Sequence, residues 1–299
     1  MIKTKSSFRS RRSFKDYFRT KKGRSFGGNL ALIIALSLFA GFFLFPVVFM
    51  VMNAFKPLYE LMRFPPTFFV RDPTIEHFLS LGVLFNNTLV PLGRYIFNSL
   101  LFLIVGTLGQ ILFGSMAAYP LAKFEFFGEK TLNRLIILAL MFSPAVTAVH
   151  NFLILANLGM IDTYWAVILP SFASTIGLFL MRNFMQQIPN SLIEAAQIDG
   201  ASEYRTFWTI IIPNVKPGMI TLFIMTFQAM WGVTGGGLIF TESLKPLPAA
   251  IGQIASGVSI ARAGEMAAVS LIMFLIPVTV FIIMQSNVLE TMTTSGMKE

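Results

Sequence analysis

Cysteine is absent from this 299-residue chain, and histidine occurs only as His77 and His150. Without cysteine the chain has no disulfide, no thiolate nucleophile and no Cys-ligated zinc or iron-sulfur site. Two isolated histidines also argue against a histidine-rich metal site. We therefore expect no metal site in the chain.

Sequence motifs for catalysis are lacking as well. No phosphate-binding GxxxxGK[ST] loop occurs, and the nearest match, GEKT at residues 128–131, has no upstream glycine at the required spacing. HExxH and GxSxG motifs are also missing, so no catalytic group is evident. We expect no catalytic residue and no cofactor bound to this chain. Without a phosphate-binding loop the chain cannot itself be an ATPase, so if its function requires ATP hydrolysis, another chain must carry it out.

Apolar residues are abundant, whereas charged residues make up only 12% of the chain. Hydrophobic residues account for 55%, phenylalanine occurs 32 times, and the mean hydropathy is +0.71. This composition is typical of an integral membrane protein. The net charge of +9 does not indicate a nucleic-acid partner, because much of it lies in a basic run within residues 1–24. Such a run before an apolar segment indicates an orientation signal, a retained signal anchor and contact with anionic membrane lipid.

The apolar stretches predict about six transmembrane helices, since about 20 residues are needed to cross the hydrocarbon core. They lie near residues 29–53, 94–119, 135–155, 164–184, 219–233 and 265–284. The second stretch carries small residues at roughly helical spacing, which permits close helix packing in lipid. These small residues are Gly106, Gly109, Gly114, Ser115, Ala117 and Ala118.

The connections between these stretches define the expected topology. Residues 56–92 and 238–264 are too polar to span and are expected as external loops, whereas 123–134 is expected as a short charged loop. The basic N-terminus places the start of the chain inside, so six spans also place the C-terminus inside. We predict an all-α integral membrane protein of the cytoplasmic membrane. Its parts are a basic N-terminal segment (1–28), a transmembrane domain (29–285) and a cytoplasmic tail (286–299).

A polar stretch, residues 189–217, lies between the fourth and fifth apolar stretches and must face water or another protein. Its charged residues are Glu194, Asp199, Glu203, Arg205 and Lys216. Pro189 to Ser191 forms a helix-start signal, and Glu194, three residues after Ser191, completes a capping-box pattern. Gly200 should end this helix with a positive φ, and Ser202 should start a second short helix. The stretch therefore predicts a cytoplasmic helix-turn-helix.

The spacing of residues in this stretch resembles the EAA loop of ABC importer membrane subunits. Glu194-Ala195-Ala196 is followed at the family's spacing by Gly200, Ile210 and Ile212-Pro213, with Ile212 where the family usually has leucine. The sequence EAAQIDGAS, residues 194–202, is most similar to the carbohydrate-uptake branch, in particular to permeases like the smaller maltose-transporter membrane subunit. The resemblance covers about residue 29 to the end of the chain.

The resemblance implies one subunit of a sugar importer, paired with a second homologous permease. Its expected partners are two ATPase subunits, which bind ATP and Mg, and an extracytoplasmic sugar-binding protein. In that family the loop inserts a coupling helix into a groove of the ATPase. The residues that this role assigns here are Glu194 for a charged contact, Ala195, Ala196 and Gly200 for close approach, Asp199 beside them, and Ile210 and Pro213 to fix the loop.

Alternatives remain open at this point. Residues 189–217 could be an ordinary interfacial helix, although the charges from Leu192 to Gly200 are only acidic, beside small residues, where Lys or Arg would be expected. The chain could be an ion-gradient-driven secondary transporter, but acidic residues are absent from the middle of its spans. A purely structural scaffold would leave the EAA spacing unexplained.

The sequence indicates the residues of a sugar pathway less clearly than those of the EAA loop. Gln228 and Trp231 on the fifth span, with Asn151 on the third, are candidates, since amides bond hydroxyls and indole rings stack on sugars. The competing interpretation is interhelical hydrogen bonding or an interfacial aromatic anchor. The end of the tail, residues 295–299, is expected either to enter the ATPase pair, as in the maltose-type subunit, or to remain solvated.

Overall fold

The computed structural model describes residues 26–86, 90–256 and 262–295. These residues form helices and connecting loops, and no strand occurs among them. The helices are α2 (Phe26–Phe55), α3 (Leu58–Leu61), α4 (Glu76–Asn86), α5 (Leu92–Lys123), α6 (Glu129–Leu140), α7 (Pro144–Asn157), α8 (Trp165–Phe172), α9 (Thr175–Gln186), α10 (Asn190–Ile198), α11 (Glu203–Thr206), the π-helical turn η1 (Phe207–Ile211), α12 (Ile212–Asn214), α13 (Lys216–Trp231), the 3-10 turn η2 (Glu242–Leu244), α14 (Leu247–Ser256) and α15 (Ala263–Ser295).

Four helices in the described part are long and apolar enough to cross a membrane. They are Gly27–Phe55, Leu92–Lys123, Trp165–Gln186 and Ala263–Ile283. Two bent helix pairs, α6 with α7 and Glu203–Asn214 with α13, raise the number to six if each pair is one span. The predicted all-α membrane fold is confirmed, while the predicted side of the membrane for each end stays a prediction.

The predicted third span, 135–155, is not one straight helix. Its first half, α6, already begins at Glu129 and ends at Leu140, and α7 begins at Pro144 after a bend of 113°. Pro144 lacks an N–H and occupies the first turn of a new helix, where Ser143 Oγ accepts the N–H of Ala145. The expected charged loop 123–134 is likewise shorter, because Lys123 still belongs to α5.

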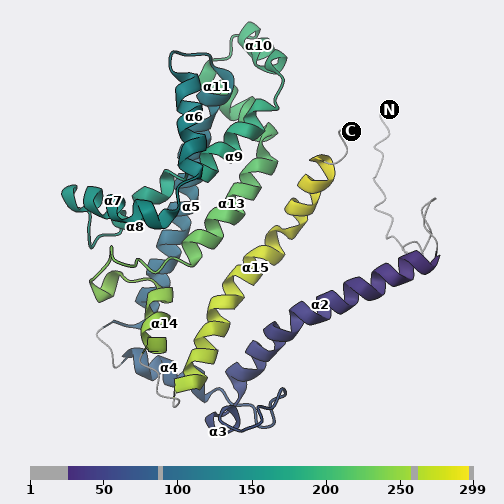
Figure 1. Cartoon of the computed structure of the whole chain (residues 1–299), viewed down its shortest axis with the longest axis vertical. Helices are drawn as coiled ribbons and strands as arrows, with labels where there is room; N and C mark the ends of the chain where they lie inside the picture. Colours follow the sequence, from purple (N-terminus) through teal and green to yellow (C-terminus); the bar gives the residue numbers. More distant parts are fainter. Residues whose placement is uncertain (1–25, 87–89, 257–261, 296–299) are drawn as a thin grey trace, which may run out of the picture.

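α5 is the central helix, and α8, α9 and α13 pack along it. The small residues predicted on this span are used for that packing. A Cβ at Gly109 would lie only 2.0 Å from Cε1 of Phe172 in α8, so glycine lets the two helices come together there. By contrast, α2 extends away from these helices, and the C-terminal end of α2 packs against α15 (Figure 1).

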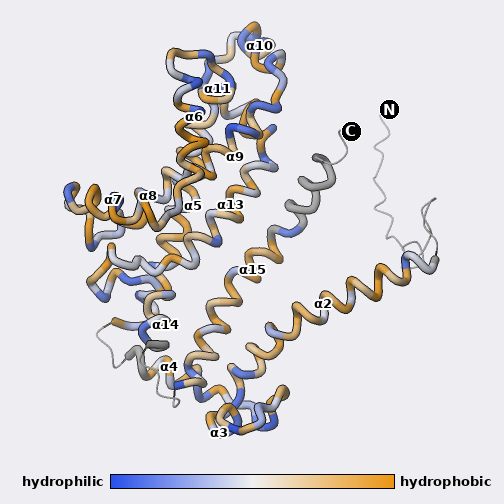
Figure 2. The backbone as a smooth tube through the Cα atoms, viewed as in Figure 1, coloured by the Kyte–Doolittle hydropathy of each residue, from blue (hydrophilic) through white to orange (hydrophobic). Residues whose placement is uncertain are grey.

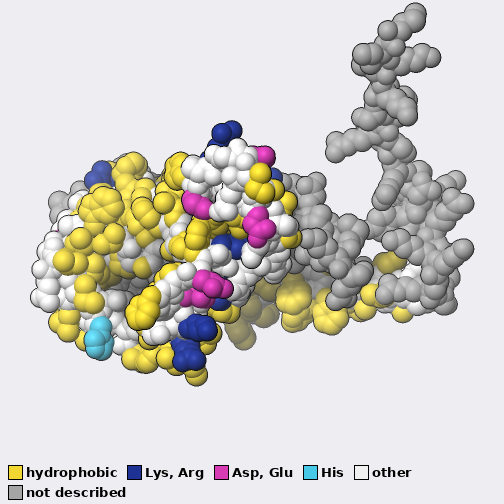
Figure 3. Space-filling view, turned by 90° about the horizontal axis from the view of Figure 1, so that it is seen from above, with side chains coloured by type: hydrophobic (Ala, Val, Ile, Leu, Met, Phe, Trp, Pro, Cys, Tyr) yellow, Lys and Arg dark blue, Asp and Glu magenta, His cyan; other side chains and the backbone are white. Residues whose placement is uncertain are grey.

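The two ends of the molecule differ. Figure 1 shows α10, α11 and the C-terminal end of α15 at one end, and α3, α4 and α14 at the other. In Figure 2 the apolar helices lie between these two more polar ends. Figure 3, which looks onto the α10 end, shows acidic and basic side chains gathered there. Residues 1–25 and 296–299, which carry the predicted basic segment and most of the predicted tail contact, lie outside the described residues.

A polar network holds the end opposite α10. The fully buried Asn98 of α5 donates from Nδ2 to the carbonyls of Ser243 and Lys245, each at 2.9 Å. Its Oδ1 accepts the hydroxyl of Tyr164 at 2.9 Å. These bonds join α5, the start of α8 and the loop before α14, as buried amides require partners.

Candidate functional site

The first helix of the polar stretch, α10, starts in a different way from the predicted capping box. Pro189 is the N-cap residue, and no side chain caps the helix. Because Asn190 is already the first helical residue, Ser191 lies inside the first turn and cannot serve as the cap. The side chain of Glu194 is exposed instead of reaching back to the helix start.

The end of α10 agrees with the prediction. Gly200 has φ +77°, the left-handed conformation that glycine adopts without penalty. Its N–H donates to the Gln197 carbonyl at 3.0 Å, and the N–H of Ala201 donates to the Ala196 carbonyl at 2.9 Å. This pair of bonds is a Schellman motif, which satisfies carbonyls that the helix end leaves free. A Cβ at Gly200 would meet no atom within 4 Å, so the glycine serves the turn and keeps an open surface.

The second short helix also begins where expected. Ser202 Oγ accepts the N–H of Arg205 at 3.3 Å and caps α11. The chain then passes through the π-helical turn η1 and α12 before it bends by 77° into α13. Ile210 is half-buried in η1, and Pro213 is exposed in α12.

α10 has one face against the bundle and one face free. Ile193 and Ala196 are buried against the bundle. Four of the predicted coupling residues, Glu194, Ala195, Asp199 and Gly200, are exposed here, whereas Ala196, which was predicted to allow close approach, is buried. Sequence reasoning missed Leu192 and Ile198, which are 43% and 86% exposed. Their positions flank Ala195 at i−3 and i+3, so helical spacing could have placed them on the same outward face.

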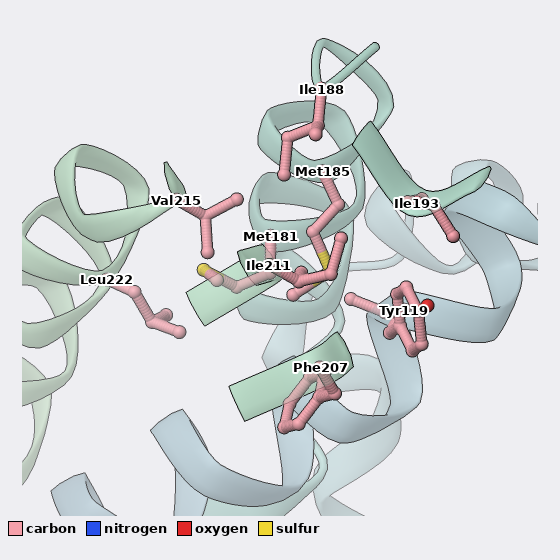
Figure 4. Close-up of a cluster of buried hydrophobic side chains, with 10 residues drawn as sticks. Tyr119, Met181, Met185, Ile188, Ile193, Phe207, Ile211, Val215 and Leu222 are labelled. Atoms are coloured by element: carbon pink, nitrogen blue, oxygen red, sulfur yellow. The ribbon is translucent and has the colours of Figure 1, made fainter. Parts of the chain in front are cut away.

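The polar stretch, residues 189–217, packs against the membrane helices through a hydrophobic cluster (Figure 4). Phe207, Ile211 and Val215 of the loop pack with Met181 and Met185 of α9 in that cluster. Met181, Met185 and Ile211 are completely buried. The cluster therefore joins the loop to the long helices beneath it.

Polar bonds add a second attachment, which sequence reasoning did not find. The hydroxyl of Tyr119 in α5 donates to Glu203 at 3.0 Å, and Gln197 Nε2 donates to the other oxygen of that carboxylate at 2.8 Å. Lys123, the last residue of α5, donates from Nζ to the Ile188 carbonyl and to Asn190 Oδ1. α5 thus holds both the entrance of α10 and the start of α11.

The candidates for a sugar path lie apart from this loop. Gln228 of α13 is exposed and borders a small hollow of about 60 Å³ between α13 and α15. Trp231 is buried, and its indole N–H donates to the Met273 carbonyl of α15 at 3.0 Å. Asn151 is exposed on α7. In this conformation Trp231 makes the interhelical bond that the competing interpretation describes.

Within the ranges that the structure describes, no group of three or more His, Asp or Glu side chains is placed to hold a metal ion. The exposed side of the polar stretch presents apolar and small residues beside carboxylates.

Comparison with known proteins identifies the family. The family described as "Binding-protein-dependent transport system inner membrane component" matches residues 110–293. The inner membrane ABC transporter permease protein YcjP of Escherichia coli K12 is 28% identical over 88% of this chain and 94% of its own length. The sn-glycerol-3-phosphate transport system permease protein UgpE of Yersinia enterocolitica is 32% identical over 71% of this chain and 75% of its own.

Solved structures give the same fold. A chain of a bacterial ABC transporter involved in the import of the acidic polysaccharide alginate superposes with a TM-score of 0.76 at 18% identity. The match covers 86% of this chain and 95% of that one. The alternative of an ion-gradient-driven secondary transporter gains no support from these matches. The chain belongs to the family of binding-protein-dependent transport system inner membrane components, as a multi-pass permease subunit of an ABC importer in the cytoplasmic membrane.

Proposed function

We propose that this permease forms half of the translocation pathway of a carbohydrate importer. The relatives that support a sugar or sugar-like cargo are named for sn-glycerol-3-phosphate in Yersinia enterocolitica and for arabinooligosaccharides in Bacillus subtilis. The latter, AraQ, is 28% identical over 68% of this chain. The other half of the pathway is a second homologous permease, and an extracytoplasmic sugar-binding protein delivers the cargo.

α10 is the part of the chain that contacts an ATPase subunit in this proposal. The observation that carries it is the outward face of α10, where Leu192, Ala195 and Ile198 expose apolar surface beside two carboxylates. Apolar side chains that stay exposed to water on a helix whose other face is packed against the bundle indicate a protein contact. ATP and Mg bind to the two ATPase subunits, and the chain itself holds neither.

The attachments of α10 explain how motion of an ATPase would reach the membrane. The buried cluster joins the loop to α9 and α13, and the side chains of Tyr119 and Lys123 join it to α5. A force on α10 therefore moves these helices together, because packed interiors deform little. The permease does conformational work, while hydrolysis takes place on the partner.

The test is capture of the ATPase by this chain, expressed with its neighbouring permease. Glu194→Lys reverses a charge on the contact face, and Gly200→Trp fills the open surface beside it. We expect both variants to lose capture at least tenfold. Glu76→Lys, the same charge reversal at an exposed site on α4, at the opposite end, is the matched control and should capture normally. Undiminished capture by both loop variants would remove α10 from the contact.

A further inference from the structure

The loop between α5 and α6, residues 124–128, exposes aromatic rings to an unusual degree. Phe127 is fully exposed, at 106% of its reference area, and Phe124 and Phe126 are 38% and 40% exposed. A phenylalanine ring has no polar atom to hydrogen-bond water, so three exposed rings in four positions are unfavourable in a solvated loop. The loop needs an apolar or amphipathic environment.

The position of the loop places it at the membrane boundary. α5 is a transmembrane candidate, α6 is one only together with α7, and an apolar side chain, Leu132, is already exposed four residues after Gly128. At about 1.5 Å per residue, those four residues cover about 6 Å along the helix. The headgroup region on each side of the hydrocarbon core is about as thick. The rings therefore lie at the depth where headgroups meet acyl chains.

The charges beside the loop suit the same environment. Lys130 and Arg134 are exposed one turn apart on α6, so their long side chains can reach lipid phosphates. Two acidic residues are also present, and one of them, Glu129, accepts Asn133 Nδ2 at 2.8 Å. The other, Glu125, is exposed. Phenylalanine next to basic side chains is typical of a segment that lies in the headgroup zone.

The loop is also connected to the entrance of α10. The ring of Phe124 packs edge-on against Tyr119 with centroids 5.3 Å apart. The neighbouring Lys123 bonds the Ile188 carbonyl and Asn190 Oδ1, directly before and at the start of α10. The depth of the loop in the membrane thus fixes the height at which α10 begins.

We propose that residues 124–128 form an interfacial membrane anchor, which inserts Phe127 among lipid headgroups and upper acyl chains of the leaflet on the α10 side. The anchor sets the depth of the α5–α6 hairpin and holds the start of α10 at a fixed distance from the bilayer. Its partner is the phospholipid surface, and no single lipid molecule is required.

The absence of cysteine from this chain makes a direct depth measurement possible, because one introduced cysteine is the only position in the chain that takes the label. The variant Phe127→Cys is spin-labelled in the full chain, paired with its second permease in nanodiscs of phosphatidylcholine and phosphatidylglycerol. Collision with apolar oxygen and with a water-soluble nickel chelate is measured before and after the ATPase is added. Phe126→Cys is a second site, should labelling at 127 disturb the loop.

Two control variants calibrate the depth. Ile137→Cys on α6, 52% exposed, reports the acyl region, and Ile198→Cys on α10, 86% exposed, reports water before the ATPase is added. We expect the label at 127 to be at least several-fold less accessible to nickel than the label at 198, and accessible to oxygen, with and without ATPase. Nickel access equal to that at 198 would show a solvated loop. Protection from both reagents only after ATPase addition would show a protein contact, and either result overturns the anchor.

The same series separates this inference from the proposed function. The label at 198 reports the ATPase contact by its own protection when the ATPase is added. A membrane-embedded label at 127 with an unprotected label at 198 would support the anchor and contradict the coupling role of α10.

Discussion

At the scale of single residues, two of the six described positions with positive φ have a clear role in the loops. Gly200 ends α10, and Asp162, with φ +61°, is the non-glycine residue with positive φ among those described. Asp162 Oδ1 accepts the N–H groups of Phe240 and Thr241 at 2.8 and 2.7 Å, and Oδ2 accepts the Thr241 hydroxyl at 2.5 Å. Aspartate tolerates this conformation, and its side chain joins the turn before α8 to the loop after α13.

Replacing Asp162 should loosen that loop. In Asp162→Ala the N–H groups of Phe240 and Thr241 lose their acceptor, so their amide hydrogen exchange should become at least tenfold faster. Asp162→Asn keeps one acceptor oxygen and the tolerance for positive φ, so its effect should be smaller. Exchange measured by mass spectrometry on the 235–244 peptide checks this, and equal protection in all three proteins would contradict it.

The charge of Asp162 also gives a pH expectation. Hydrogen bonds from Thr241, first from its hydroxyl and then from its N–H, together with the N–H of Phe240, hold the pKa of this carboxyl below its ordinary value. The ionised carboxylate therefore stabilises the loop after α13 fully at any pH above the ordinary aspartate pKa. This stabilisation is lost only as the pH falls through the lowered pKa of Asp162. Loop protection measured at each pH should stay constant from about pH 5 to 8. A loss of protection within that range would contradict the assignment.

Gly200 gives the third prediction at this scale. A β-carbon there has free space, so Gly200→Ala should cost only the backbone strain of the left-handed conformation, about 1 kcal/mol. Gly200→Val adds the penalty of a β-branched side chain and should cost more. Thermal unfolding of the purified permease pair should rank the variants wild type, Ala, Val. A larger loss of thermal stability in Gly200→Ala than in Gly200→Val would show that a factor other than the positive φ determines stability at this position.

At the scale of elements, the loop is held from two sides. The hydrophobic cluster fixes η1 and α12 to α9, whereas the Tyr119 hydroxyl bonds Glu203 and so fixes α11 to α5. A π-helical turn lies between the buried Phe207 and Ile211, within this attachment. Such turns are frequent at functional sites. The stiffness of the connection between α10 and the membrane helices therefore depends on both attachments.

Removing the polar attachment should weaken coupling without abolishing assembly. Tyr119→Phe keeps the ring in the cluster and loses one hydrogen bond, worth about 1 kcal/mol. We expect normal capture of the ATPase but a several-fold smaller stimulation of ATP hydrolysis by loaded binding protein. Tyr204→Phe, at a residue 69% exposed in the same loop, is the matched control and should behave as wild type. Equal stimulation in both variants would show that the cluster alone carries the connection.

At the scale of the whole molecule, the two polar ends must lie on opposite sides of a membrane. α10 and the end of α15 share one end, and α3, α4 and α14 share the other (Figure 1). The basic N-terminal segment predicts that the α10 end is cytoplasmic. Opposite orientation would leave α10 where no ATPase can reach it.

Single cysteines test this orientation directly. Ile75→Cys, in the loop before α4, replaces a residue 60% exposed and should react with a membrane-impermeant maleimide from the outer side of intact spheroplasts. Ile198→Cys should react only after the membrane is opened. The wild-type chain, which has no cysteine, is the blank. Labelling of position 198 in intact spheroplasts would reverse the topology.

Local chemistry is what the sequence by itself determined. The apolar stretches predicted the membrane class, Gly200 and Ser202 predicted the turn and the second helix start, and the spacing from Glu194 to Pro213 predicted the family. Each of these features lies within one continuous stretch of about 20 residues or fewer, so it can be predicted without knowing the fold. The start of α10 was misread because Pro189, directly before it, took the cap position.

Only the tertiary structure decided which helices cover one another. Tyr119 and Lys123 bond residues of the loop 84 and 65 positions further along the chain, and Trp231 is covered by α15. The break at Pro144, where a single span was expected, and the outward direction of Ile198 likewise depend on the packing around them. Periodicity gives a helix its apolar face, but the partner of that face is chosen by contacts between distant segments.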